Sequence, residues 1–215
     1  MRMSAIVALS GLAKKAPFHF CNYNLAADRP EQTAGEPEYQ PAHCRFISQA
    51  DLQSWLACGA QPEQAQQQQE LGIYLPDVYA SDFFFLEQQH NYISTMAYMR
   101  MINDLLPLDI ERYELAFAAF VVLHEYGHWL HFRRCHKSSV EYVLWLNRFL
   151  APVERQREIL DLLPDSEPLK EPLVVEHINA YNAMPQEFSA NKYALKHVAQ
   201  LYARLIKKAD KYNKV

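Results

Sequence analysis

The chain has 215 residues, of which 50% are hydrophobic and 13% aromatic, and its formal net charge is −4 at pH 7. This length and composition suit a globular protein with a sizeable core. The mildly negative charge excludes the broad basic field that nucleic-acid binding needs, and no run reaches the ~18 apolar residues of a membrane span. We therefore expect neither a nucleic-acid partner nor a transmembrane segment.

Residues 1–70 are predicted to form an N-terminal segment that ends in a glutamine-rich linker, residues 61–70. Positions 4–13 faintly resemble a short signal peptide, but Ser and Gly dilute the apolar stretch, so an ordinary first helix or strand is favoured. Residues 28–42 are rich in Pro, Glu and Gln, which predicts a loop. A short helix is predicted for 48–57.

The cysteines form no C-x-x-C pair and no disulfide framework: they are Cys21, Cys44, Cys58 and Cys135. Reduced thiols in a cytosol are the simplest interpretation, and with no clear secretion signal we expect a cytoplasmic protein. Two His/Cys pairs, His19 with Cys21 and His43 with Cys44, are a conceivable second zinc site. Their spacing is less tight and regular than such sites usually have.

Residues 71–215 are predicted to form the main domain. Two short extended stretches come first, at 72–75 and 82–86, the second because its aromatic run is typical of a buried strand. Helices are predicted for the remainder, with a loop at 164–172; they cover 91–105, 110–137, 139–150, 152–163, 173–183 and 185–209. The expected fold class is therefore α+β and mainly helical.

The most informative feature is His-Glu-Tyr-Gly-His at 124–128, an H-E-x-x-H pattern that follows the apolar run 115–123. A helix places His124 and His128 on one face one turn apart, where both imidazoles can bind one zinc ion. Glu125 takes the adjacent angular position and can act as general base on the attacking water. The alternative is a core helix whose histidines only form hydrogen bonds, but two His and a Glu are costly to bury unpaired.

A zinc peptidase needs a third protein ligand. A metzincin would continue with Gly at 131 and His at 134, whereas this chain has His131 and Arg134, so that class is excluded. Because His131 shares a helical face with His128, we expect a structural or supporting role for it, with His136 a weaker rival. A carboxylate from a second helix is the remaining option.

Glu187 is the best candidate for that carboxylate. Pro185 suits the first turn of a helix, on which Glu187 and Asn191 share a face. Ala190 and Ala194 are small and let this helix approach another closely, and Gly127 has the same effect on the motif helix. An amide one turn after a carboxylate ligand can hydrogen-bond a ligand imidazole and fix its tautomer.

Other residues remain alternatives. Glu176 is the main competitor for the third ligand, whereas the spacing around Glu141 predicts a helix capping box. His177 and Tyr181 are candidate catalytic residues that stabilise the transition state, and Tyr193 is a further candidate. For any one tyrosine, a packed ring with a satisfied hydroxyl is the more ordinary role.

Taken together, the two motifs resemble those of the gluzincin metallopeptidases of the ImmA/IrrE type, which carry H-E-x-x-H and, on a later helix, E-x-x-A-N. Here the second motif is Glu187, Ala190 and Asn191. The integral-membrane CaaX-type prenyl-protein peptidases carry a related E-x-x-A-D, but this chain lacks their spans. The resemblance implies a zincin-like domain with a small antiparallel sheet beside the motif helix. An edge strand there would pair with an extended peptide, and we assign that edge to residues 82–86.

The resemblance also implies chemistry: zinc held by His124, His128 and Glu187, Glu125 as base, and Asn191 orienting a ligand. Proteins of this type cut regulatory proteins in the cytosol, so we expect a selective intracellular metallopeptidase with a protein or peptide substrate. The alternative is a non-catalytic, zinc-containing module that binds a protein or peptide, and hydrolysis of a non-peptide amide is a third possibility. The intact Glu125 argues against a purely structural site, which does not need it.

Overall fold

The computed structural model describes residues 1–21, 41–47, 70–106, 112–164 and 169–212. Several expectations lie outside these residues: the helix at 48–57, most of the loop at 28–42, most of the glutamine-rich linker, and the state of Cys58. All structural statements below concern the described part of the chain.

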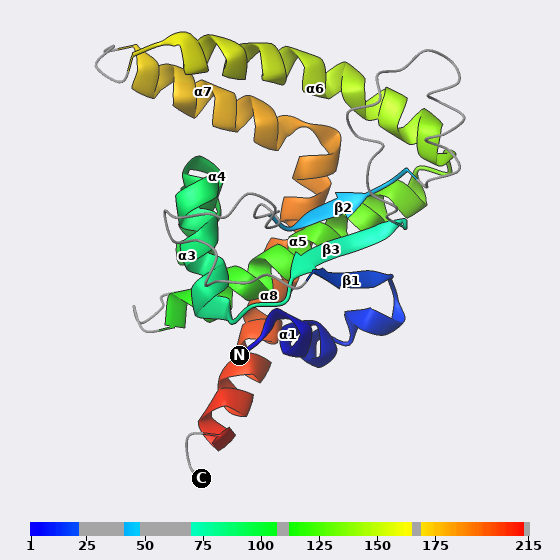
Figure 1. Ribbon diagram of the computed structural model, residues 1–215, viewed down its shortest axis with the longest axis vertical. Coiled ribbons are helices and arrows are strands. Elements are labelled where there is room, and N and C mark those ends of the chain that lie inside the picture. The colour runs from blue at the N-terminus through cyan, green and yellow to red at the C-terminus, as the bar shows by residue number, and fades with distance from the viewer. Residues whose placement is uncertain (22–40, 48–69, 107–111, 165–168, 213–215) are drawn as a thin grey trace, which may run out of the picture.

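The described chain is mainly helical with one small sheet, which confirms the α+β class (Figure 1). None of these helices combines the length and apolarity that a bilayer crossing requires. The elements in chain order are α1 (Met3–Ser10), the short 3-10 helix η1 (Leu12–Lys14), β1 (Phe18–Cys21), β2 (His43–Arg45), β3 (Gly72–Pro76), α3 (Ala80–His90), α4 (Tyr92–Asn103), α5 (Tyr113–Arg134), α6 (Ser139–Leu162), α7 (Lys170–Ala183) and α8 (Pro185–Tyr212).

The sheet has the strand order β1-β3-β2 and is mixed. Ile73 of the central strand lies opposite Phe18 in a parallel pair and opposite Cys44 in an antiparallel pair. The expected antiparallel pairing is thus correct for β2 and β3 but wrong for β1 and β3, which are parallel. The sequence between β1 and β3 is long enough for the crossover that a parallel pair needs. β1 and β2 precede residue 70, and both pair with β3, which follows it.

The predicted strand at 82–86 is wrong, because these residues lie within α3. Phe83 and Leu86 are buried, whereas Phe85 between them is 57% exposed. Burial three residues apart is the signature of a helix, since a strand would alternate its two faces. A short aromatic run fits both structures, and the choice is made here by packing against α5.

Two helix boundaries also differ from expectation. The helices expected on either side of residue 151 are a single helix, α6, with Pro152 inside it. Pro152 is exposed, so water can hydrate the carbonyl that its missing N–H leaves without a donor. In the same way α7 begins at Lys170, within the expected loop, because Pro172 falls in the first turn, where a proline is tolerated.

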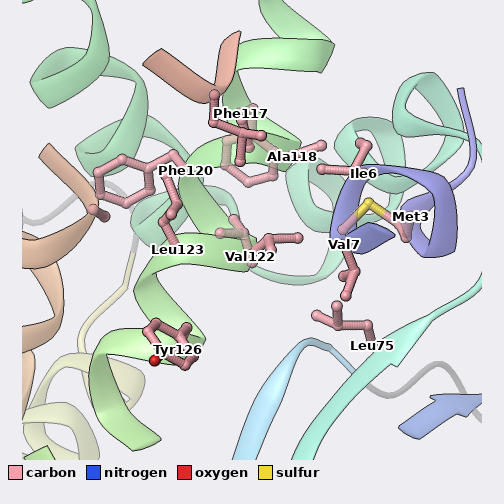
Figure 2. Close-up of a cluster of buried hydrophobic side chains, with 14 of the residues drawn as sticks. Met3, Ile6, Val7, Leu75, Phe117, Ala118, Phe120, Val122, Leu123 and Tyr126 are labelled. Atoms are coloured by element: carbon pink, nitrogen blue, oxygen red, sulfur yellow. The ribbon is translucent and has the colours of Figure 1, made fainter. Parts of the chain in front are cut away.

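Helix α5 forms the centre of the molecule, and its residues from Leu115 to Trp129 are all buried. Figure 2 shows side chains of α1 directed at this helix, with Ile6 beside Ala118 and Val7 near Val122 and Leu75 of β3. Elements on every side of α5 therefore cover it, which explains why its sequence is apolar without a polar face. The motif at 124–128 lies in the covered part.

The closest packing partner of α5 is α8, and small residues make this possible. A Cβ atom added to Gly127 would lie only 2.6 Å from the Cα of Ala190, so the two backbones are in direct contact. Ala190 and Ala194 are completely buried. The expected close approach of the two motif helices is confirmed, and it brings one face of α8 against the histidines of α5.

Candidate metal centre

Three donor side chains from α5 and α8 converge at one point. The Nε2 atoms of His124 and His128 are 2.9 Å apart, and the carboxylate oxygens of Glu187 lie 3.4 Å from each of them. All three residues are buried. Within the described residues, this is the group of His, Cys, Asp or Glu side chains that could hold a metal ion.

The spacing of these donors fits a metal ion. Ligand atoms at ~2.0–2.1 Å from a tetrahedral zinc ion are about 3.3 Å apart. The two separations between Glu187 and the histidines, both 3.4 Å, agree with this value, whereas the two Nε2 atoms, 2.9 Å apart, are closer together. Glu187 Oε2 is buried and makes no hydrogen bond among the described residues. A buried carboxylate oxygen without a donor is costly. A cation among the three donors would remove that cost.

Asn191 holds one of the two imidazoles. Its Oδ1 lies 2.9 Å from His124 Nδ1, and its Nδ2 donates to Asn182 Oδ1 at 3.1 Å. With the Asn191 amide in this orientation, Nδ1 of His124 carries the proton. The lone pair of Nε2 then points to the space between His124, His128 and Glu187, where a metal ion would bind. The expected hydrogen bond between Asn191 and one of the two imidazoles is thus present, and that imidazole is the ring of His124. His128 Nδ1 is buried and has no partner among the described residues.

Glu125 is buried beside this group and lines the same cavity. Burial raises its pKa to about 7, with His124 opposing the rise and Glu187 adding to it. Burial also raises the pKa of Glu187, but the positive charge of His128 and the contacts with both histidines outweigh it and hold that pKa well below its ordinary value. One carboxyl group therefore exchanges protons near neutral pH while the other stays ionised.

Two cavities adjoin at this site. The first, about 360 Å³, contains the three donors and Glu125, and β2, α3 and α7 supply other parts of its wall. The second, about 590 Å³, lies between α3 and α4 on one side and α6 and α7 on the other. Residues common to both linings form the boundary: Asn91, Ser94, Tyr98 and Tyr181.

The predicted transition-state residues lie in different places. Tyr181 lines both cavities, and its pKa is raised by burial and by the negative charge of Glu187. His177 lines only the second cavity, so it is set apart from the donor group. Tyr193 lines neither cavity and packs its ring against Tyr126.

The rival ligands are excluded by position. Glu176 is exposed on α7 and is not in the donor group. His131 contacts Tyr142 Oη through Nδ1 at 2.8 Å, which is a structural role, and His136 is exposed beyond the end of α5. Glu141 forms the predicted capping box at the start of α6.

The conceivable second zinc site does not assemble among the described residues. His19 of β1 and His43 of β2 instead stack on the ring of Tyr74 in β3, with centroids 4.6 and 5.2 Å apart. Cys21 and Cys44 are free thiols. The pairs were adjacent in sequence, but strand pairing directs the histidines to a shared aromatic stack.

Two residues at the site were missed by sequence reasoning. Tyr98 of α4 places its hydroxyl oxygen 3.3 Å from His124 Nε2. Glu87 of α3 is buried in the lining of the first cavity and accepts a hydrogen bond from Asn91 Nδ2 at 3.1 Å. The chain has 13 tyrosines, and nothing in the local sequence around Tyr98 distinguishes it from the others. Only the crossing of α4 over α5 brings it here.

Comparisons of this chain with protein-family models, with curated proteins and with solved structures found no match.

Proposed function

We propose that this protein is a zinc-dependent metallopeptidase of zincin-like fold that hydrolyses peptide bonds. The observation that carries the proposal is the convergence of His124, His128 and Glu187 with a buried glutamate, Glu125, in the same cavity. Two imidazoles and one carboxylate are the ligand set of a catalytic zinc site that keeps a fourth position open. The resemblance of the two motifs to the ImmA/IrrE type supports the same conclusion.

In this mechanism His124, His128 and Glu187 hold the metal, and Asn191 fixes the tautomer of His124. When bound, zinc supplies a Lewis acid that polarises the scissile carbonyl and acidifies the attacking water. The packing of Gly127 against Ala190 sets the distance between the two helices that carry the ligands. Burial keeps bulk water away and strengthens each electrostatic contact at the reacting atoms.

Glu125 moves the proton. Its carboxylate accepts a proton from the attacking water and returns it to the leaving amine nitrogen. Burial favours the protonated form of Glu125, which suits a group that must take up a proton and release it within one turnover. A purely structural zinc site would gain nothing from a buried carboxyl group at this place, which disfavours the non-catalytic alternative.

Strand β2 is the part of the sheet that we assign to substrate binding, in place of residues 82–86. It lies at the edge of the described sheet, and His43 and Cys44 line the first cavity. An extended peptide can add to such an edge by main-chain hydrogen bonds. That arrangement would lay the peptide along the cavity that contains Glu125. We propose a selective cytosolic protease and not a digestive enzyme, because the motifs resemble those of the ImmA/IrrE type and the described cysteines are free thiols.

The test is Glu125→Gln. We expect this variant to bind one zinc ion per chain but to lose at least about 100-fold in peptide hydrolysis, since general acid–base catalysis is removed. Zinc is measured by elemental analysis and cleavage by proteomic mapping of an unfolded protein mixture, with and without chelator. Glu141→Gln, which changes an exposed glutamate, is the matched control and should retain both properties. Undiminished cleavage by Glu125→Gln, or cleavage that ignores the chelator, contradicts the proposal.

A further inference from the structure

Tyr98 is a partly buried tyrosine that faces the donor group from α4, the helix that precedes the H-E-x-x-H helix. Its ring packs on Phe120 and His124 of α5, with centroids 5.0 and 5.1 Å apart. Its hydroxyl oxygen lies 3.3 Å from His124 Nε2, the nitrogen that faces the other donors. The ring is therefore held by the motif helix itself, and its hydroxyl is directed at the reacting end of His124.

The distance from Tyr98 Oη to His124 Nε2 places this hydroxyl beside the three donor atoms. Tyr98 Oη is as far from His124 Nε2 as the Glu187 carboxylate oxygen is, at 3.3 and 3.4 Å. It also lines the first cavity, where a substrate carbonyl must enter to reach the donor group. Asn191 supports the opposite side of the same imidazole through Nδ1. Tyr98 and Asn191 thus contact the two nitrogens of one ring.

The hydrogen-bond inventory explains what the hydroxyl can do. Because Nδ1 of His124 donates to Asn191, Nε2 has a lone pair, and the Tyr98 hydroxyl is the donor in their contact. Once Nε2 gives that lone pair to a metal ion, the Tyr98 hydroxyl needs another acceptor. The carbonyl oxygen of the scissile peptide bond is an acceptor that the reaction brings to this place.

We propose that Tyr98 is a catalytic residue whose hydroxyl donates a hydrogen bond to the scissile carbonyl oxygen as negative charge develops on that atom. This inference rests on the proposed peptidase function. A donor held in place before the reaction costs no reorganisation, which is why such groups lower barriers efficiently. The hydroxyl keeps its proton throughout, so Glu125 remains the only group that transfers one.

The other candidates are less well placed. Tyr181 lines the first cavity near Glu187, whose negative charge raises the pKa of the Tyr181 hydroxyl, but it does not contact an imidazole of the donor group among the hydrogen bonds of the described residues. His177 lies in the second cavity. Among the described tyrosines, Tyr98 is the one that hydrogen-bonds an imidazole of the donor group.

The variant Tyr98→Phe tests the proposal, because it removes the hydroxyl and keeps the ring that packs on α5. We expect one zinc ion per chain, as in the wild type, with kcat lower by about 100- to 1,000-fold and a smaller change in KM. Tyr193→Phe is the matched control, because that ring packs outside both cavities, and it should cleave like the wild type.

Two further readouts do not depend on turnover. The zinc-loaded Tyr98→Phe variant should bind benzohydroxamate about tenfold more weakly than the wild type, because the carbonyl oxygen of the hydroxamate loses the hydrogen bond from the Tyr98 hydroxyl. Wild-type protein loaded with Cu²⁺ should show no phenolate-to-copper absorption band, since Tyr98 is a hydrogen-bond donor and not a ligand. Wild-type rates and hydroxamate affinity in Tyr98→Phe overturn the proposal, as does a phenolate band that this variant removes.

The outcome separates the two proposals. If the wild type cleaves, Glu125→Gln does not, and Tyr98→Phe equals the wild type, only the role of Tyr98 is wrong. If Glu125→Gln cleaves as well as the wild type, the proposed function falls and the role of Tyr98 with it.

Discussion

The two helix pairs around the cavities are built in opposite ways. α5 and α8 meet through a backbone contact at Gly127 and Ala190, and α5 is buried from Leu115 to Trp129. α6 and α7 run side by side at the top of Figure 1, yet α7 has no buried residue among those described. Several large apolar side chains on this second pair are exposed: Leu144, Ile159, Leu162, Leu173 and Val175.

The difference follows from what each pair has to hold. To hold a metal ion as proposed, the donor atoms of His124, His128 and Glu187 must keep their separations within a few tenths of an ångström, and a close-packed interface between their helices provides this. α6 and α7 supply a cavity wall, which tolerates looser packing and opens at a lower free-energy cost. Under the proposed function, the metal ligands lie on the rigid pair, and the loosely packed pair lines the neighbouring cavity.

The largest expected effect comes from breaking the rigid pair with Gly127→Ala. In an ordinary helix this change stabilises by about 0.5–1 kcal/mol, because glycine is a poor helix former. Here the new Cβ would lie 2.6 Å from the Cα of Ala190, so α8 must move away. We expect a loss of about 1–3 kcal/mol of stability by chemical denaturation and weakened zinc binding by titration. A stabilised variant that retains its zinc affinity would show that the two backbones are not in contact.

A smaller effect, confined to the metal centre, is expected from Asn191→Ala. The substitution leaves His124 Nδ1 without its acceptor and frees the tautomer and orientation of the ring. Supporting groups of this kind change metal affinity by about 10- to 100-fold, so zinc titration of the metal-free protein should show a loss in that range. Lys192→Ala, at the neighbouring exposed position on α8, is the control. Equal zinc affinities in the two variants would mean that Asn191 does not support His124.

Much of the candidate site could be predicted because it depends on spacing along single helices. His124 and His128 share a face by helix geometry, and Glu187 and Asn191 do so on a second helix, so each motif is complete locally. Small residues at 127 and 190 then indicated where the helices meet. Tyr98 could not be found in this way, since its place depends on how α4 crosses α5, which no local pattern encodes.

The errors in the fold have the same origin. The run Phe83–Leu86 is compatible with a strand or a helix, and contact with α5 decides for the helix. Pro152 suggested a break, but its exposed position lets α6 continue. Local signals were reliable where they completed a structure on their own, as in the capping box at Glu141, and failed where a neighbouring element decided.

That capping box also gives the smallest expected effect and tests the loosely packed pair. With few buried side chains, the start of α6 depends on local hydrogen bonds: Ser138 Oγ accepts from the N–H of Glu141, and the Glu141 carboxylate accepts from the N–H and the hydroxyl of Ser138. The hydrogen bonds from Ser138 lower the pKa of Glu141 below its ordinary value. Ser138→Ala removes the N-cap hydroxyl, a change that typically costs about 1 kcal/mol near pH 7.

The pH dependence has a definite sign. A carboxyl group whose pKa is lowered by folding stabilises the protein above its unfolded pKa and loses that contribution as the pH falls through the folded value. The stability difference between the wild type and Ser138→Ala, measured by urea unfolding, should therefore be constant above about pH 5.5 and shrink towards pH 3. Glu141→Gln should remove most of the pH dependence, since its amide is neutral throughout. If Ser138→Ala lowers stability equally at pH 3 and pH 7, packing and not the capping box stabilises the start of α6, as it does for α5. The two helix pairs would then differ less than their burial suggests.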